Sequence, residues 1–374
     1  MPKIKNVTAI ILSVFIVLYL IFSPRYIFAT IEKGRVPFWQ RKEESFNGII
    51  ELWHIVGFKP HTGSVSSWLG NRTKEFEKKH HGVFVNITSM TIEDYYKKKS
   101  LGMSADIYSV PLGLEYSDSY YKLNYDCLFE SLPYIRSDFI NSGMSKNQII
   151  ALPFLYSGYC LITNDSLLTA ENQITIPFTS NDISEISKNM SAENNLALCG
   201  NPIIAGYYGI STPIDSYDKF KTGNAPLSIN DFRSVGDIER RQDAKNSFPI
   251  SSYSITDFTD LVQYVAFDKN ISEVKLPYAY EFISKLYSDK AQSSLALLNC
   301  YPVINFENPD KLLKEYNSIA FNAFSLYYSP KIPNFFLYKR HYDKLIEEAE
   351  LSFLGDIDAK TRFANRIKEI LSID

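Results

Sequence analysis

The chain has 374 residues, of which 45% are hydrophobic and 22% are charged, and this ordinary globular composition excludes wholesale disorder and collagen-like repeats. Lysine and arginine together number 39, and aspartate and glutamate 42. The formal net charge of -3 therefore gives no electrostatic reason to expect a nucleic acid as the main partner. The length is enough for roughly two domains of about 150 residues each.

Aromatic residues make up 14% of the chain, with 26 tyrosines and 25 phenylalanines but only 3 tryptophans. One interpretation is a large hydrophobic core. The other is a pocket lined with rings that stack on a flat-faced ligand such as a sugar. Composition alone leaves both interpretations open.

The amino terminus carries an apolar run. Lys3 and Lys5 precede the stretch from Val7 to Phe22, which has no charged residue. Its length lies near the border between a signal-peptide core of about 7–15 residues and a spanning helix of about 17–25. The bulky residues before Ala29 do not resemble a cleavage site. We therefore expect residues 1–45 to form a transmembrane anchor and a tether, with a cleaved signal peptide as the alternative.

The basic residues around this run bear on its orientation. Two lysines precede it, and five basic residues follow it: Arg25, Lys33, Arg35, Arg41 and Lys42. The positive-inside rule would place the rest of the chain in the cytoplasm. This charge count opposes an extracytoplasmic location of the body.

The first part of the body alternates between strand and helix patterns. A near-continuous apolar run over 49–56 predicts a buried strand, and Ser64 is a suitable N-cap for a helix. A second strand is expected over 83–87, a short helix from Thr91, and a third strand over 106–110. This order predicts an α/β fold that begins as a doubly wound sheet with right-handed crossovers.

The middle of the chain gives weaker signals. Short strands are expected over 149–154 and 158–164, and a further strand over 258–267. The polar stretch over 167–250 predicts only short helices and loops.

The last part of the chain is predicted to be helical. Helical spacing continues over 278–286, and Asp289 with Gln292 forms a capping-box pattern that restarts the helix. Two helices close the chain, with Gly355 ending the first and Asp358 capping the second. We assign their apolar stripes to the core.

Motifs for metal binding or catalysis are missing from the sequence. The histidines have no H-x-x-x-H spacing on a predicted helix, and the four cysteines have no zinc spacing. There is also no Walker loop, G-x-S-x-G or H-E-x-x-H motif. We expect no metal, no cofactor and no enzymatic activity, although the many carboxylates leave a glycosidase open.

An ordered set of stretches resembles the family 1 extracellular solute-binding proteins, which are substrate receptors of ABC importers with the two-lobed type II periplasmic-binding fold. Glu51-Leu52-Trp53-His54 matches the opening strand, and Ala105-Asp106-Ile107 stands where the family usually has proline, aspartate and an apolar residue. The matching stretches are 50–85, 105–107, 151–164 and 279–303, and the final helix pair also fits.

The resemblance implies two α/β lobes that close by a hinge around a ligand in the cleft between them. It predicts residues 1–45 as anchor or signal and tether, 46–153 as the first part of lobe 1, and 154–268 as the first part of lobe 2. The chain would return to lobe 1 over 269–302 and complete lobe 2 over 303–374.

Candidate ligand-binding residues in the first lobe lie at strand and helix ends. Trp53 and His54 end the first strand, where a tryptophan can stack on a ligand and a histidine can donate to a hydroxyl. Gly63 and Ser64 precede a helix amino terminus, and Ser109 follows the third strand. Each has a structural alternative: Trp53 as a core ring, His54 as a satisfied buried side chain and Ser64 as an ordinary N-cap.

The remaining candidates are tyrosines. Tyr156 lies in the stretch between the lobes, and Tyr301 precedes the second hinge. Tyr207 and Tyr208 form an aromatic pair between two glycines, of which one ring would line the cleft while the other packs.

The resemblance implies an extracytoplasmic solute-binding protein of an ABC importer that captures a carbohydrate. The expected partners are this small-molecule ligand, the permease subunits and the membrane, with a monomeric body and no nucleic acid. The expected location is the cell membrane, single-pass with an extracytoplasmic body, or outside the cell after signal cleavage. A membrane-tethered sensor or non-transport paralogue is the first alternative, and an extracytoplasmic glycan-active enzyme the second.

Overall fold

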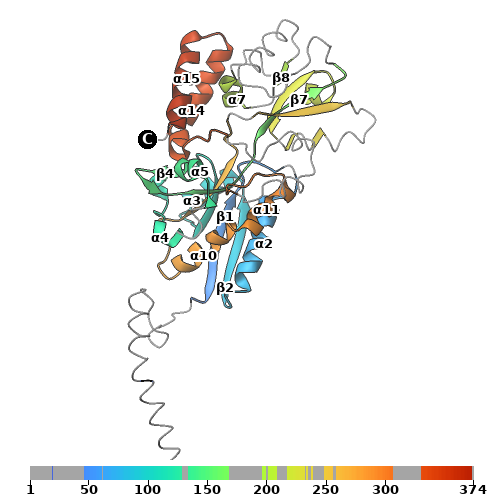
Figure 1. Cartoon of the computed structure of the whole chain (residues 1–374). Helices are drawn as coiled ribbons and strands as arrows, with labels where there is room; N and C mark the ends of the chain where they lie inside the picture. The colour runs from blue at the N-terminus through green and yellow to red at the C-terminus, as the bar shows by residue number, and fades with distance from the viewer. Residues whose placement is uncertain are drawn as a thin grey trace, which may run out of the picture. The chain divides into compact units, whose positions relative to one another are not determined.

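The computed structural model describes Tyr19 and residues 46–60, 62–128, 134–167, 196–198, 201–208, 217–231, 233–234, 237–238, 248–255, 258–305 and 330–372 (Figure 1). The chain divides into two units, Met1–Phe46 and Asn47–Asp374. Apart from Tyr19, the expected anchor and tether lie outside the described residues. Among the described helices, none is both long enough and apolar enough to cross a membrane. The named helices and strands all lie in the second unit.

A five-stranded sheet in the unit Asn47–Asp374 combines four strands from its first half with β11 from its second half. Its strands are ordered β2-β1-β3-β11-β6. Strand β1 pairs in parallel with β2 and β3, whereas β11 is antiparallel to both of its neighbours. The expected β-α-β-α-β start is confirmed. The strand bounds are Gly48–Ile55 for β1, Val83–Met90 for β2, Ile107–Pro111 for β3, Leu152–Tyr156 for β6 and Val262–Phe267 for β11.

The two helices between these strands begin where the sequence predicts. Helix α2 (Val65–Glu77) starts after Ser64, whose hydroxyl accepts a hydrogen bond from the Ser67 amide. Helix α3 (Ile92–Ser100) starts after Thr91, which accepts from the Asp94 amide in the same way. Both caps satisfy amide groups that the first helical turn leaves without partners.

Helix α10 (Leu276–Leu286) packs against α2. Helix α11 (Asp289–Ser293) then begins after Ser288, whose hydroxyl accepts from the Ala291 amide. The predicted capping residue, Asp289, is therefore wrong by one position: Ser288 has the extended backbone of a cap, whereas Asp289 is already helical.

A second sheet of four strands has the order β10-β7-β9-β8. Strand β7 is antiparallel to β9 and β10, and β8 is parallel to β9. The expectation of helices and loops alone over 167–250 is wrong, because β8 and β9 lie within this stretch. The bounds are Tyr159–Asn164 for β7, Leu196–Leu198 for β8, Leu227–Asp231 for β9 and Ile250–Ile255 for β10, with helices α7 (Pro202–Tyr207) and α8 (Tyr217–Lys221).

The two carboxyl-terminal helices, α14 (Phe335–Phe353) and α15 (Ile357–Leu371), pack against each other and beside α7 (Figure 1). Gly355 has a φ of +90° after α14, as its predicted role requires. The N-cap of α15 is Asp356, which accepts from the Ala359 amide, so the prediction of Asp358 is wrong. Asp358 lies instead in the first helical turn.

Short elements complete the described structure. They are η1 (Ser117–Ser119), α4 (Tyr125–Leu128), α5 (Ser137–Ser142), β4 (Met144–Ser145), β5 (Gln148–Ile149) and η4 (Ser294–Leu298).

Three segments lie side by side where the chain changes sheet. The chain leaves the five-stranded sheet after β6, and the Ser157 amide donates to the Leu261 carbonyl just before β11. Thr259 donates through its hydroxyl to the Ser157 carbonyl at 2.8 Å. Tyr156 and Tyr301 exchange two backbone hydrogen bonds. These contacts fix the connections between the sheets, while the predicted lobe boundaries stay predictions.

Candidate functional site

His54, Ser109 and Gln263 form a hydrogen-bonded group at one edge of the five-stranded sheet. His54 is the penultimate residue of β1, and its register partner Ser109 is the middle residue of β3. Gln263 lies in the adjacent strand β11. His54 Nδ1 lies 2.9 Å from Ser109 Oγ, and Gln263 Nε2 lies 3.0 Å from the same oxygen. Only 3% of His54 and 1% of Ser109 are exposed. Two predicted site residues are thus in direct contact.

Burial lowers the pKa of His54 to about 4, because the imidazolium form loses its hydration inside the protein. The ring is therefore neutral at neutral pH. A neutral imidazole offers one N–H donor and one acceptor nitrogen, and either suits a ligand hydroxyl.

Trp53 lies in an aromatic cluster on the opposite face of the sheet from His54, because successive strand residues alternate between faces. Its ring meets Tyr95 and Tyr108 edge-on, with centroids 6.4 and 6.0 Å away. The Lys98 ammonium lies 5.3 Å from the ring centroid. Only 4% of Trp53 is exposed, which leaves little of the ring available in this arrangement. Its proposed stacking on a ligand stays a prediction.

Gly63 and Ser64 lie in the loop that enters α2. Gly63 has a φ of +64°, and an added Cβ would lie 2.9 Å from Leu298 Cδ2. The preceding hydroxyl, on Thr62, donates to the Leu297 carbonyl at 2.6 Å. The loop is therefore held against η4, and Ser64 has the ordinary capping role described above.

Tyr156 and Tyr301 stack at the connection between the sheets, with centroids 5.1 Å apart and planes inclined by 27°. Both are buried, and burial raises the pKa of Tyr156 to about 12. The tyrosine hydroxyl is therefore protonated at neutral pH and lies 3.5 Å from an Arg136 nitrogen. The stacked rings add a side-chain contact to the backbone pairing of Tyr156 with Tyr301.

Tyr207 and Tyr208 end helix α7 on the side of the four-stranded sheet. Tyr207 stacks on Phe258 at a centroid distance of 4.9 Å and meets Tyr208 edge-on at 5.0 Å. Tyr208 is buried, whereas Tyr207 keeps part of its ring exposed. A role for either ring in lining a ligand cleft stays a prediction.

Asp260 collects hydrogen bonds from three other elements, and the sequence analysis missed it. Its carboxylate accepts from Tyr159 at 2.6 Å and from Tyr338 at 2.8 Å, and Asn201 Nδ2 lies 3.3 Å away. The donors come from β7, α14 and the cap of α7. One signal was available: Asp260 is an acidic residue within a run otherwise assigned to an apolar strand.

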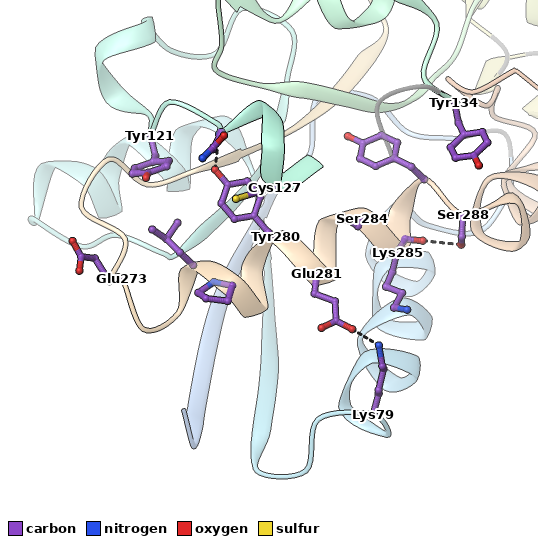
Figure 2. Close-up of a pocket in the computed structure, with 14 residues that line it drawn as sticks. Lys79, Tyr121, Cys127, Tyr134, Glu273, Tyr280, Glu281, Ser284, Lys285 and Ser288 are labelled. Carbon is purple, nitrogen blue, oxygen red and sulfur yellow. Dashed lines mark hydrogen bonds and ion pairs between the residues drawn. The ribbon is translucent and has the colours of Figure 1, made fainter. Parts of the chain in front are cut away.

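A cavity of about 790 Å³ lies beside α10 (Figure 2). Lys79 and Glu281 form an ion pair of 2.6 Å at its wall, and the Tyr280 hydroxyl accepts from the Asn124 amide. A second cavity of about 480 Å³ lies between the β4–β5 hairpin and α14. The described walls of both cavities contain none of the nine predicted site residues.

Comparison by sequence finds no matching protein-family model and no matching curated protein. Comparison by structure finds many related folds. The cyclic α-maltosyl-1,6-maltose-binding protein of Arthrobacter globiformis has a TM-score of 0.65 at 11% identity, over 87% of this chain and 99% of the other. The galacto-N-biose/lacto-N-biose I-binding protein of Bifidobacterium longum has 0.62 at 12%, over 86% and 95%.

An ABC substrate-binding protein from Listeria monocytogenes, solved with cycloalternan, has a TM-score of 0.59 at 14% identity, over 87% of this chain and 98% of the other. The likeness covers almost the whole length of each of these proteins. The chain therefore has the two-lobed α/β fold of ABC substrate-binding proteins, and this part of the expected fold is confirmed. The comparisons do not support the expected N-terminal transmembrane helix, which stays a prediction.

Proposed function

We propose that this chain is the solute-binding protein of an ABC importer and captures a carbohydrate between two lobes built on the two sheets. The observation that carries the proposal is the fold, which the chain shares over 86–87% of its length with two proteins named for the sugars they bind and one solved in complex with cycloalternan. The chain would bind its solute and release it unchanged.

The proposed ligand contacts differ in accessibility. The partly exposed ring of Tyr207 is the platform, since an aromatic face covers the apolar face of a sugar. His54 supplies a polar contact from the other sheet. The loop at Gly63 and Ser64 borders the ligand, and the buried residues Trp53, Ser109, Tyr156, Tyr208 and Tyr301 hold the site's walls in place.

A thermal-shift screen followed by calorimetry tests this function. Each oligosaccharide is paired with an isomer of equal mass that has the opposite anomeric linkage, such as maltose with cellobiose, so that general solvent effects cancel. A ligand at about 100 times its Kd adds about 2.7 kcal/mol to the free energy of unfolding and raises the Tm. A panel in which no sugar shifts the Tm or gives heat of binding contradicts the proposal.

The same proposal places residues 1–45 in the membrane as an anchor and the body outside the cytoplasm. An impermeant maleimide on intact cells tests the orientation. Lys368 is exposed on α15, and the native Cys127 is also exposed. Lys368→Cys in a Cys127→Ser background should label more strongly than Cys127→Ser alone. Equal labelling before cell lysis, with a difference only afterwards, contradicts an extracytoplasmic body.

A further inference from the structure

The hydrogen bonds of Gln263, Ser109 and His54 have a defined direction. Gln263 Nε2 lies 2.9 Å from the Ile55 carbonyl oxygen and 3.0 Å from Ser109 Oγ. A carbonyl oxygen can only accept, so the atom that contacts it must be the amide nitrogen. This contact fixes the orientation of the Gln263 amide, which donates one hydrogen to Ile55 and the other to Ser109.

The Ser109 hydroxyl links the Gln263 amide to the His54 ring. The hydroxyl oxygen accepts from Gln263 and keeps one hydrogen to donate, and His54 Nδ1 lies 2.9 Å away. When the hydroxyl donates to Nδ1, all three groups are satisfied. Nδ1 is then the acceptor nitrogen, and the neutral ring carries its proton on Nε2.

The Nε2–H group meets no acceptor among the residues that the structure describes. The side chain is almost fully buried, with 3% exposed, but Nε2 is not among the polar atoms that are both buried and without a partner, so this nitrogen keeps some contact with solvent. His54 lies at the carboxyl end of a parallel strand, the edge at which open α/β sheets bind ligands. A ligand oxygen at this position would complete the chain of hydrogen bonds.

We infer that His54 presents Nε2–H as a fixed hydrogen-bond donor to a carbohydrate oxygen, and that Ser109 and Gln263 hold this tautomer without touching the solute. This inference rests on the proposed function. It makes Ser109 a positioning residue in place of the direct contact expected from the sequence, and it adds Gln263, which the sequence analysis did not single out.

The first test needs no ligand. The imidazole ¹⁵N resonances of the full chain, labelled on its 5 histidines, report which nitrogen of each ring carries the proton. His54 is assigned by the signal that His54→Gln removes. We expect the Nε2–H form at pH 7 in the wild type, and a mixture of tautomers in Ser109→Ala and Gln263→Met. The wild-type spectrum alone decides the tautomer, even if a variant fails to fold.

Ser142→Ala is the matched control. Ser142 also has a buried hydroxyl, and it is hydrogen-bonded to Tyr264, the residue after Gln263 in β11. This substitution should leave the His54 signals unchanged. An Nδ1–H form in the wild type overturns the inference. So does an unchanged tautomer in folded Ser109→Ala and Gln263→Met.

The second test measures affinity for a carbohydrate that the wild type binds. His54→Phe should weaken binding by about tenfold, the effect of losing one donor. His54→Gln should recover part of the loss, since its amide places a donor near Nε2. Unchanged affinity in folded His54→Phe overturns the solute contact. If the wild type binds no carbohydrate, the proposed function fails and the solute contact fails with it, whereas the tautomer measured without ligand is unaffected.

Discussion

His54 and Trp53 are neighbours in β1 whose side chains leave opposite faces of the sheet. One joins a chain of polar groups and the other a cluster of rings, although both are almost fully buried. At the scale of the residue, therefore, burial alone does not separate a site residue from a core residue. The hydrogen-bond partners of the side chain do.

The protonation of His54 makes stability depend on pH. Its pKa is about 4 in the folded chain and near 6.5 when the chain unfolds. The unfolded state therefore binds the extra proton as pH falls from 6.5 towards 4, and the free energy of unfolding decreases by up to about 3 kcal/mol. Urea unfolding across this pH range should show a shallower dependence in His54→Gln. The same dependence in both proteins would mean that other groups cause it.

Tyr207 and Trp53 should respond in opposite ways to truncation. Tyr207→Ala removes a partly exposed ring and should weaken sugar binding by about 1–3 kcal/mol with a small loss of stability. Trp53→Ala empties a buried site and should cost about 3–5 kcal/mol of folding free energy. Calorimetry and urea unfolding on both variants check this, with Tyr207→Phe as the control that keeps the ring. A sugar affinity untouched by Tyr207→Ala would exclude it as the platform.

At the scale of elements, Asp260 is the residue through which a connection between the sheets contacts β7 and α14. Two tyrosine hydroxyls, from Tyr159 and Tyr338, donate to its two carboxylate oxygens. Both hydroxyls are deeply buried, and burial raises the pKa of each tyrosine well above its ordinary value. Both hydroxyls therefore keep their protons and donate them to the Asp260 carboxylate.

Asp260→Ala should lower the free energy of unfolding by about 2–5 kcal/mol, since it leaves two buried hydroxyls without their acceptor. Asp260→Asn keeps one acceptor oxygen and should lose less. Asp343→Ala, on the exposed face of α14, should change stability by less than about 0.5 kcal/mol. Urea unfolding gives all three values. A loss in Asp260→Ala no greater than in Asp343→Ala would remove the role assigned to this carboxylate.

At the scale of the molecule, the compact unit begins at Asn47, and the Gly48 amide already donates to the Gly82 carbonyl. The chain from Asn47 to Asp374 should therefore fold without the preceding residues. Circular dichroism and cooperative thermal unfolding should resemble those of the full chain. A chain that starts at Gly57 lacks β1, which pairs with both β2 and β3, and should not fold. Cooperative folding of that shorter chain would contradict this assignment of the core.

Features set by neighbouring residues could be predicted from the sequence. The caps at Ser64 and Thr91 depend on amides three residues away, and the first strands have continuous apolar patterns. Strand β9 was missed because only two apolar residues, Leu227 and Ile229, alternate with Ser228 and Asn230, and so short a pattern does not stand out in a polar stretch.

The site shows the same division between local and distant contacts. His54 and Ser109 were found because each lies towards the carboxyl side of a predicted strand. Gln263 was missed because its partner Ser109 lies 154 residues away in the sequence, and no local pattern links them. The structural role of Asp260 likewise depends on hydrogen bonds from Tyr159 and Tyr338, which lie far from it in the sequence.

Strand β11 lies between β3 and β6, although in the chain it begins about 150 residues after the end of β3 and about 105 residues after the end of β6. While a ribosome is still adding residues, β3 and β6 have no common partner, and the first hydrophobic core stays open until β11 emerges. Such long-range pairing slows folding and prolongs the exposure of apolar surface. The nascent chain consequently remains loosely structured, and within reach of chaperones, for most of its synthesis.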